Sequence, residues 1–422
     1  MNTHCHVTSL ALACLLSVVL TSCKQSNNAE FVQEVSWGIS GKWLRLDTHT
    51  HTQFSDGAYS LNDLVDRAST AGCDVLAITD HGDLSSTATS PAYFEAIDKA
   101  RLNHPNLILF AGMEWNIPPY GGREHVTLLV DKPFEKKLLP AFKYQFESGK
   151  ATAPEALQWL AAKLERERAG VLIYNHPSRK DSDVQENLRD MQGWRAINRL
   201  FIGFEGAPGH QKNSVVGSYE GKLKPIERWD PVVAEIGGVW DTLLSQGEQV
   251  WGALASSDFH NDEMDYTPCT YSLTHIQVPE RSQSGVLQAL RAGSFWADHG
   301  HILDRLSFII VAPGLPLPAT PGETIRVPAD ATLQLRVLLQ RGIGALNAPM
   351  TVDIIGNSRS GNPELLASQT LAAAQNTFDW SPGKMLVGAD GKSSYFRVRV
   401  NTKDSTGKPL HAYTNPIRVV LK

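Results

Sequence analysis

Residues 44–51 read Leu44-Arg45-Leu46-Asp47-Thr48-His49-Thr50-His51. Leu44 and Leu46 alternate with polar residues, which predicts a strand with one buried face. The same period of two continues through Asp47, His49 and His51, so an extended chain points these three side chains to one face. Two imidazoles and a carboxylate on one face suit a divalent metal ion. A His-x-His pair also occurs in ordinary strands, so this reading depends on the rest of the chain.

Further apolar runs end in residues of the same kinds. They are residues 75–78, followed by Asp80 and His81; 107–110, followed by Glu114; 171–174, followed by His176; 200–204, followed by Glu205; and 250–255, followed by Asp258 and His260. His125 is an exception, because it precedes its apolar run at 126–130. Helical patterns lie between the runs, at about 60–72, 92–102, 153–164, 231–246 and 284–291. The alternation predicts a parallel α/β sheet closed into a barrel, with the active site at the carboxyl ends of the strands.

Length and composition set the broad class of the protein. The chain has 422 residues, of which 42% are hydrophobic and 20% charged, with a net charge of −5. This length exceeds a single ordinary core, so we expect two domains. The absence of a long basic run argues against nucleic-acid binding as the main task. Oligomeric state is not readable from the sequence.

The first 22 residues resemble a bacterial lipoprotein signal peptide that ends before Cys23. Residues 23–42 then form a polar tether. The segment before residue 10 has no Lys or Arg, which leaves a plain secretory signal as the alternative. We expect export to the periplasm of a Gram-negative bacterium, with a lipid anchor on Cys23 in the outer membrane as the only membrane contact. For Cys73 and Cys269 we expect two buried thiols, with a disulfide as the alternative.

The pattern of strand ends resembles the PHP (polymerase and histidinol phosphatase) family of metal-dependent hydrolases over roughly residues 44–300. The resemblance implies a distorted seven-stranded (β/α) barrel over residues 43–312. It implies nine metal ligands: His49, His51, Asp56, His81, Glu114, His125, His176, Asp258 and His260. Metal 1 would be held by His49, His51, Glu114 and Asp258. Metal 2 would be held by Asp56, His81 and His260, and metal 3 by His125, His176 and a bridging Glu114.

Imidazole and carboxylate ligands suit Zn, Mn or Fe, and we expect two or three ions per chain. A bridging carboxylate can hold two cations ~3.5–4 Å apart, the separation used in two-metal hydrolysis. Glu114, Asp258 and His260 are therefore the predicted catalytic residues.

Other residues have weaker predicted roles. Arg179 and Lys180 would hold an anionic substrate, or are solvated loop charges. His299 would face the substrate, or is a loop histidine. Trp115 and Asn116 would line the pocket, or pack in the core. Asp47 would orient a ligand imidazole from behind, with Glu205 a further candidate for such a role. We expect the remaining histidines to be surface or turn residues: His104, His210, His275, His301 and His411.

The C-terminal part has a different pattern. Prolines at 313, 316, 318 and 321 mark a linker over residues 313–326. Residues 332–337, 395–400 and 417–419 alternate between apolar and polar residues, which predicts a small antiparallel all-β sandwich domain over residues 327–422. Such a domain would pack on the barrel or bind a surface.

Three functions are compatible with these features. The leading one is a metal-dependent phosphoesterase that acts on a small-molecule phosphomonoester or phosphodiester. The second is a carboxyl- or carbamate-ester metallohydrolase, because exported PHP proteins with a β tail also resemble carbaryl hydrolases. The third is a non-catalytic metal-binding lipoprotein, which would normally have lost some of the ligands.

Overall fold

The computed structural model describes residues 28–422 except 120–124, 148–150, 181–182, 359 and 384–390. The predicted signal peptide, Cys23 and the start of the tether lie outside the described residues. Within the described part of the chain, no helix combines the length and apolarity needed to cross a bilayer.

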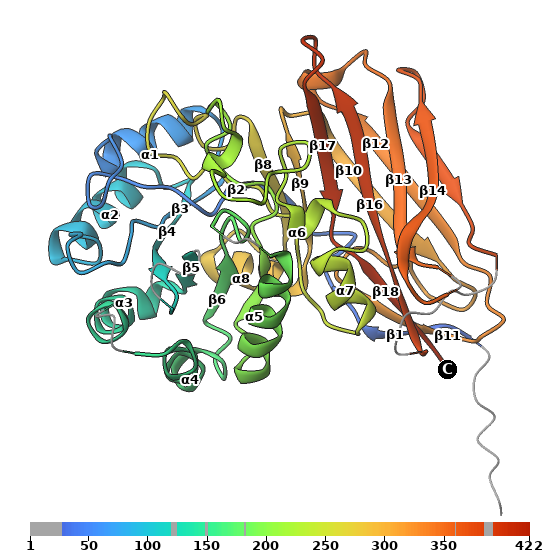
Figure 1. The fold of residues 1–422 in the computed structure, drawn as a ribbon, viewed down its shortest axis with the longest axis horizontal. Helices are drawn as coiled ribbons and strands as arrows, with labels where there is room; N and C mark the ends of the chain where they lie inside the picture. The colour runs from blue at the N-terminus through green and yellow to red at the C-terminus, as the bar shows by residue number, and fades with distance from the viewer. Residues whose placement is uncertain (1–27, 120–124, 148–150, 181–182, 359, 384–390) are drawn as a thin grey trace, which may run out of the picture.

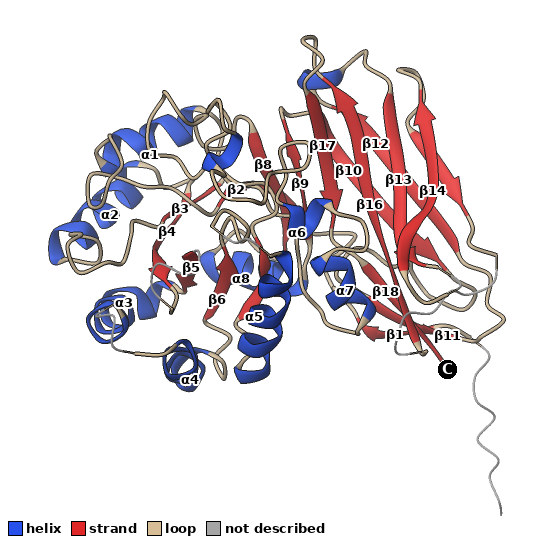
Figure 2. Cartoon of the chain, in the orientation of Figure 1, coloured by secondary structure: helices blue, strands red, loops and turns tan. Residues whose placement is uncertain are grey.

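An α/β part comes first, with helices on the outside of its strands (Figures 1 and 2). Its strands are β2 (Lys42–Asp47), β3 (Val75–Ile78), β4 (Ile108–Asn116), β5 (His125–Val130), β6 (Gly170–Tyr174), β7 (Phe201–Phe204), β8 (Ser272–Val278) and β9 (Phe295–His299). Its helices are α1 (Leu61–Thr70), α2 (Pro91–Asn103), α3 (Lys132–Phe146), α4 (Ala153–Leu164), α5 (Val184–Ile197), α6 (Pro231–Ala234), α7 (Val239–Ser245) and α8 (Gln283–Ala292). A short 3-10 turn covers Val216–Ser218.

Local sequence signals explain several of these boundaries. The Ser60 side chain accepts a hydrogen bond from the Asp63 amide and caps α1. Thr152 and Glu155 form a reciprocal capping box at α4. The helix predicted over 231–246 is instead divided into α6 and α7, because Gly237 lies between them with φ +79.

The sheet is mixed, which corrects the expectation of a parallel one. β2, β3 and β4 are parallel neighbours, and so are β6 and β7. β5 is antiparallel to both β4 and β6, and β8 is antiparallel to both β2 and β9. The named strands from β8 to β7 form an open path. Where a strand was expected at 250–255, only isolated bridges form, which pair Trp251 with Gly203 of β7 and Ala255 with Ala207. A closed barrel stays a prediction.

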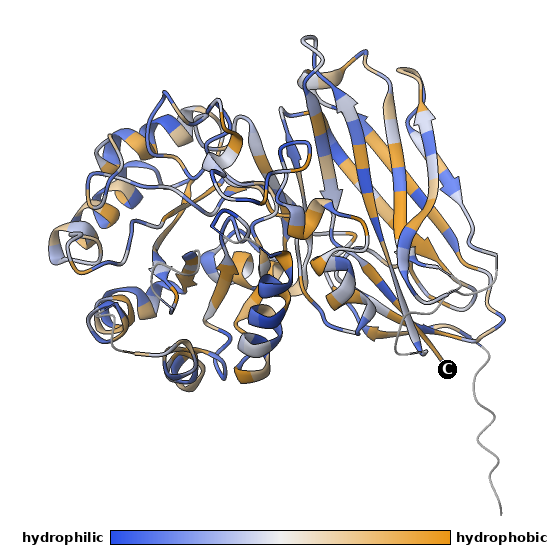
Figure 3. Ribbon diagram, in the orientation of Figure 1, coloured by the Kyte–Doolittle hydropathy of each residue, from blue (hydrophilic) through white to orange (hydrophobic). Residues whose placement is uncertain are grey.

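The β-rich part consists of two facing sheets. Its strands are β1 (Glu30–Gln33), β10 (Leu303–Val311), β11 (Thr324–Val327), β12 (Gln334–Arg341), β13 (Met350–Asn357), β14 (Pro363–Leu371), β15 (Thr377–Trp380), β16 (Ser393–Lys403), β17 (Pro409–Thr414) and β18 (Ile417–Leu421), with a 3-10 turn at Ile343–Ala345. Alternating hydropathy along these strands matches a sandwich core (Figure 3), and β12 buries every second residue. β10, β12 and β15 form one sheet.

The other sheet continues into the α/β part, because β17 pairs with β9. β1 and β10 come from outside the predicted 327–422 segment, yet they pair with β11 and β12. A buried ion pair adds a second connection: Arg397 of β16 contacts both carboxylate oxygens of Asp241 in α7, at 2.7 and 2.8 Å. The two parts therefore share one hydrogen-bonded sheet.

Cys73 and Cys269 form a disulfide, so the expectation of two free thiols is wrong. Cys73 follows α1, and Cys269 lies in the segment between His260 and β8. The bond joins positions 196 residues apart in the chain. A disulfide is typical of an oxidising compartment.

We expect a Cys73→Ser/Cys269→Ser variant to lose about 3–5 kcal/mol of unfolding free energy, because the bond restricts a long loop of the unfolded chain. Urea unfolding of the oxidised protein and the double variant measures this difference. Peptide mapping without reductant is the control, and recovery of the two cysteines as separate thiol peptides would contradict the bond.

Candidate metal centre

Histidines and carboxylates meet at one edge of the α/β sheet. His49 and His51 follow β2, His81 follows β3, and His176 follows β6. Glu114 lies within β4 and forms an isolated bridge with His81. His125, the exception in the sequence pattern, begins β5 and is paired with Asn116 at the end of β4. Because β5 is antiparallel to its neighbours, its first residue lies at the edge where theirs end.

Glu114 is the centre of the cluster. It is 1% exposed and contacts five imidazoles through its two oxygens. Oε1 lies 3.0 Å from His49 Nε2, 3.1 Å from His125 Nδ1 and 3.3 Å from His176 Nε2. Oε2 lies 3.0 Å from His81 Nδ1 and 3.5 Å from His51 Nε2. Glu114 therefore has the contacts expected of a bridging ligand.

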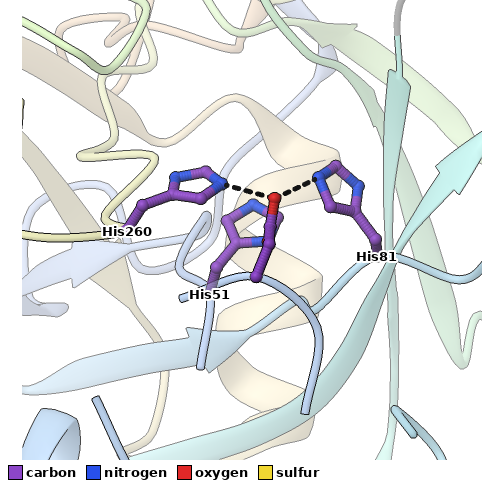
Figure 4. A group of neighbouring side chains, drawn as sticks. His51, His81 and His260 are labelled. Carbon is purple, nitrogen blue, oxygen red and sulfur yellow. Dashed lines mark ion pairs between the residues drawn. The ribbon is translucent and has the colours of Figure 1, made fainter. Parts of the chain in front are cut away.

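A second group surrounds Asp56, whose side chain is 52% exposed. Nε2 of His81 and Nε2 of His260 each lie 3.4 Å from Asp56 Oδ2, and the two rings point to that oxygen from opposite sides (Figure 4). His51 Nδ1 lies 3.5 Å from Oδ1 of the same carboxylate. These four residues offer donor atoms within 4.8 Å of one another. His51 thus joins the set expected for metal 2.

Asp258 completes the predicted nine. Its Oδ1 lies 3.2 Å from His49 Nε2 and 3.3 Å from His51 Nε2. His49, His176 and Asp258 form one group of potential ligands, and His81, Glu114 and His125 form another. The structure therefore brings all nine predicted residues together. His81 lies in its expected group and also beside Glu114 and His125, where the resemblance implied His176, and His176 instead groups with His49 and Asp258.

The charges in this cluster are strongly coupled. Burial alone would raise the pKa of Glu114, but His125, His49 and His81 hold it well below its usual range. Burial would lower the pKa of His49, but Asp258, Glu114 and Glu205 hold it well above its usual range. Buried carboxylates that favour positive charge at neighbouring rings, as they do at His49 and His81, are the electrostatic setting of a cation site.

Two buried carboxylates outside the predicted ligand set, Glu205 and Asp47, hold the cluster in position. Glu205 Oε1 lies 3.1 Å from His49 Nδ1, and its Oε2 accepts a hydrogen bond from the His176 amide at 2.9 Å. Asp47 accepts hydrogen bonds from the His49 and Ser257 amides, so it holds the backbone and not the imidazole. The role expected of Asp47 is therefore filled by Glu205.

Sequence reasoning did not select Asp80 or Asn175. Asp80 accepts hydrogen bonds from the Thr52 amide and hydroxyl and from the Ser55 hydroxyl, so it shapes the loop that carries Asp56. Asn175 Nδ2 donates to Glu114 Oε1 at 2.8 Å. Each residue directly precedes a predicted ligand histidine in the sequence, and this adjacency could have identified both as candidates for the site.

The predicted substrate residues have different positions. Arg179 Nη2 contacts Asp258 Oδ2 at 2.9 Å, while the next residue, Lys180, is exposed. Trp115 is fully buried against Phe142, so core packing, the alternative reading, is the correct one. Asn116 donates to Glu147 from its amide and side chain.

His299, also predicted to face the substrate, is a buried residue within β9 and not a loop histidine. Its ring lies against Trp229 and Tyr271. Three of the remaining histidines are buried, contrary to expectation: His210, His275 and His411.

The donor set fits divalent transition metals. Imidazole nitrogens and carboxylate oxygens converge, whereas both cysteines of the described chain are held in the disulfide. The inner residues are nearly inaccessible, at 0–2% exposure for His49, Glu114, His176 and Asp258. Asp56, His81 and His260 are more exposed, at 52%, 20% and 13%. The cluster therefore opens to solvent on the Asp56 side.

Comparisons with known proteins give a family and two distant structural likenesses. A two-domain protein from Bacteroides vulgatus, containing a predicted PHP-like metal-dependent phosphoesterase, is 13% identical, with 90% of this chain and 95% of that chain covered and a TM-score of 0.42. An amidohydrolase from Chromobacterium violaceum is 16% identical, with 58% and 96% covered and a TM-score of 0.32. At these TM-scores we draw no conclusion from either structure. A comparison with curated proteins gave no match.

The family model for the PHP domain matches residues 47–168. This segment contains His49, His51, Asp56, His81, Glu114 and His125, which is six of the nine clustered residues. The other three come from later in the chain and contact the same cluster. Residues 47–168 of this chain are a PHP domain.

Proposed function

We propose that this protein is a metal-dependent phosphoesterase that holds two or three divalent cations, Zn, Mn or Fe, at the Glu114 cluster. The observation that carries the proposal is a single buried carboxylate in contact with five imidazoles. The PHP domain match supports the coarser assignment to metal-dependent hydrolases. Specificity for phosphoesters goes beyond this assignment and is tested separately below.

The buried and the more exposed residues of the cluster would have different roles. Cations bound here would supply Lewis acidity and activate a water molecule for attack. Glu114, His49 and His176 form the closed floor, with the His49 ring fixed by Glu205. Asp56, His81 and His260 form the open side, so a substrate would enter next to them. A compact phosphate group would contact this side first.

A substrate panel tests the activity. We expect hydrolysis of p-nitrophenyl phosphate or bis-p-nitrophenyl phosphate that a chelator abolishes and added Mn²⁺ or Zn²⁺ restores. Elemental analysis of the same sample should give two or three metal ions per chain. Turnover of 1-naphthyl esters alone would replace the phosphoesterase with a carboxyl-ester metallohydrolase. Less than about one metal ion per chain, with no turnover, would contradict both.

Glu114→Gln should lower the metal content and slow hydrolysis at least ~100-fold, because a neutral amide bridges two cations poorly. Loss of bound cations would remove several kcal/mol of Lewis-acid stabilisation of the transition state. About 1.4 kcal/mol corresponds to a tenfold change in rate. The measurements are metal stoichiometry and kcat/KM. Glu147→Gln is the matched control, since Glu147 is a buried carboxylate that hydrogen-bonds Asn116. Full metal content and a near-normal rate in Glu114→Gln would exclude the bridging role.

Metal binding should release protons. Burial would lower the pKa of His81, but Glu114 and Asp56 raise it to about 11. Burial likewise opposes charge on His260, but Asp56 and Asp258 raise its pKa to about 9. Both rings are therefore protonated at neutral pH without metal, and a cation must displace those protons.

We expect apparent metal affinity to rise between pH 6 and 8 by roughly tenfold per pH unit for each proton displaced. Calorimetric titrations at one pH, in buffers of different ionisation enthalpy, count the released protons. An affinity independent of pH, with no proton release, would show that these rings are not ligands.

A further inference from the structure

His210 lies beside the cluster because its loop packs directly on the segment that carries Asp258. Beyond β7, Ala207 and Ala255 form a parallel bridge, so residues 208–210 run alongside 256–258. A Cβ atom on Gly209 would lie 2.1 Å from the Asp258 Cβ and 2.3 Å from the Ser257 carbonyl oxygen. Only glycine allows so close an approach, and the next residue, His210, is 6% exposed.

A buried carboxylate sets the orientation of the His210 ring. Asp265 is fully buried, and its Oδ1 lies 2.7 Å from His210 Nδ1 and accepts the His210 amide at 3.1 Å. Its Oδ2 accepts the His260 amide at 2.6 Å. Asp265 thus ties the His210 loop to the loop that carries two predicted ligands. A ring that donates Nδ1–H to a carboxylate has its Nε2 lone pair available on the opposite side.

That Nε2 points into the cluster. It lies 3.2 Å from Asp258 Oδ2, and the His210 and His260 ring centroids are 5.2 Å apart. His210, His260 and Asp265 form a group of potential ligands in their own right. His49 has the same arrangement. Glu205 Oε1 lies 3.1 Å from its Nδ1, and Asp258 Oδ1 lies 3.2 Å from its Nε2. The two histidines therefore face the two oxygens of one carboxylate in the same way.

We propose that His210 is a tenth metal ligand, which shares Asp258 with the site of His49 and is held in its ligating tautomer by Asp265. This inference rests on the metal centre of the proposed function. Arg179 also contacts Asp258 Oδ2, but a carboxylate oxygen has two lone pairs, so Oδ2 can accept the Arg179 N–H with one and would bind a cation with the other. Asp258 would then join two cations through separate oxygens, as Glu114 would on the other side of the cluster.

Competition with a chelator tests the proposal through metal affinity. In His210→Ala we expect the weakest-bound cation to be held ~10–100-fold less tightly, and in Asp265→Asn a smaller loss in the same direction. Added imidazole should restore binding in His210→Ala, which a general loss of packing would not permit. With Co²⁺ as the probe, the visible absorption spectrum should change in His210→Ala and be retained in Asp265→Asn at saturating metal. His210→Gln, with a similar volume, replaces the alanine variant if that variant does not fold.

His104→Ala is the matched control, because His104 also pairs with an aspartate, with Nε2 2.6 Å from Asp66 Oδ1, but away from the cluster. Its metal affinity and Co²⁺ spectrum should match those of the wild type. Wild-type affinity and an unchanged Co²⁺ spectrum in folded His210→Ala would overturn the tenth ligand while leaving the proposed function intact. Absence of metal binding by the wild-type chain would overturn both.

Discussion

The burial of Glu114 constrains the rest of the structure. A carboxylate that is 1% exposed costs several kcal/mol unless positive charge and hydrogen-bond donors surround it. Five imidazoles and the Asn175 amide meet this need. These partners come from the ends of β2, β3 and β6 and from the start of β5, so four strands must be placed around β4 before the charge is balanced. The sheet can therefore be regarded as a scaffold that brings imidazole side chains to one buried carboxylate.

Much of the site could be predicted because its signals are local. A histidine or carboxylate directly after a buried strand marks the active edge of an α/β sheet, and each such signal needs only a few adjacent residues. The helix caps at Ser60 and Thr152 are likewise local, since each involves residues only three positions apart. Strand direction was not readable, since it depends on which neighbours a strand pairs with. The antiparallel direction of β5 explains why His125 precedes its apolar run and still reaches Glu114.

The parts that sequence reasoning missed depend on contacts between distant segments. Nothing next to His210 in the sequence indicates a site, because its position follows from the close approach at Gly209 and from Asp265, 55 residues later. Cys73 and Cys269 are separated by a still longer stretch of chain. Only their proximity in the folded structure distinguishes a disulfide from two buried thiols. Trp115 shows the opposite error, since adjacency to Glu114 suggested a pocket whereas strand alternation points the indole into the core.

The shared sheet gives the β-rich part a physical connection to the metal cluster. Asn415, between β17 and β18, is fully buried and accepts hydrogen bonds at Oδ1 from the amides of Gly252 and Ala253, each at 3.2 Å. Its Nδ2 donates to the Gly293 and Phe295 carbonyls. Gly252 and Ala253 begin the segment that leads to Asp258. This segment lacks the continuous pairing of a named strand, so side-chain contacts supplement the backbone hydrogen bonds that the Gly206 and Ala207 amides donate to the Leu254 carbonyl. Asn415 at its start and Asp47 at Ser257 do so from opposite ends, which makes the C-terminal part a support for the position of Asp258.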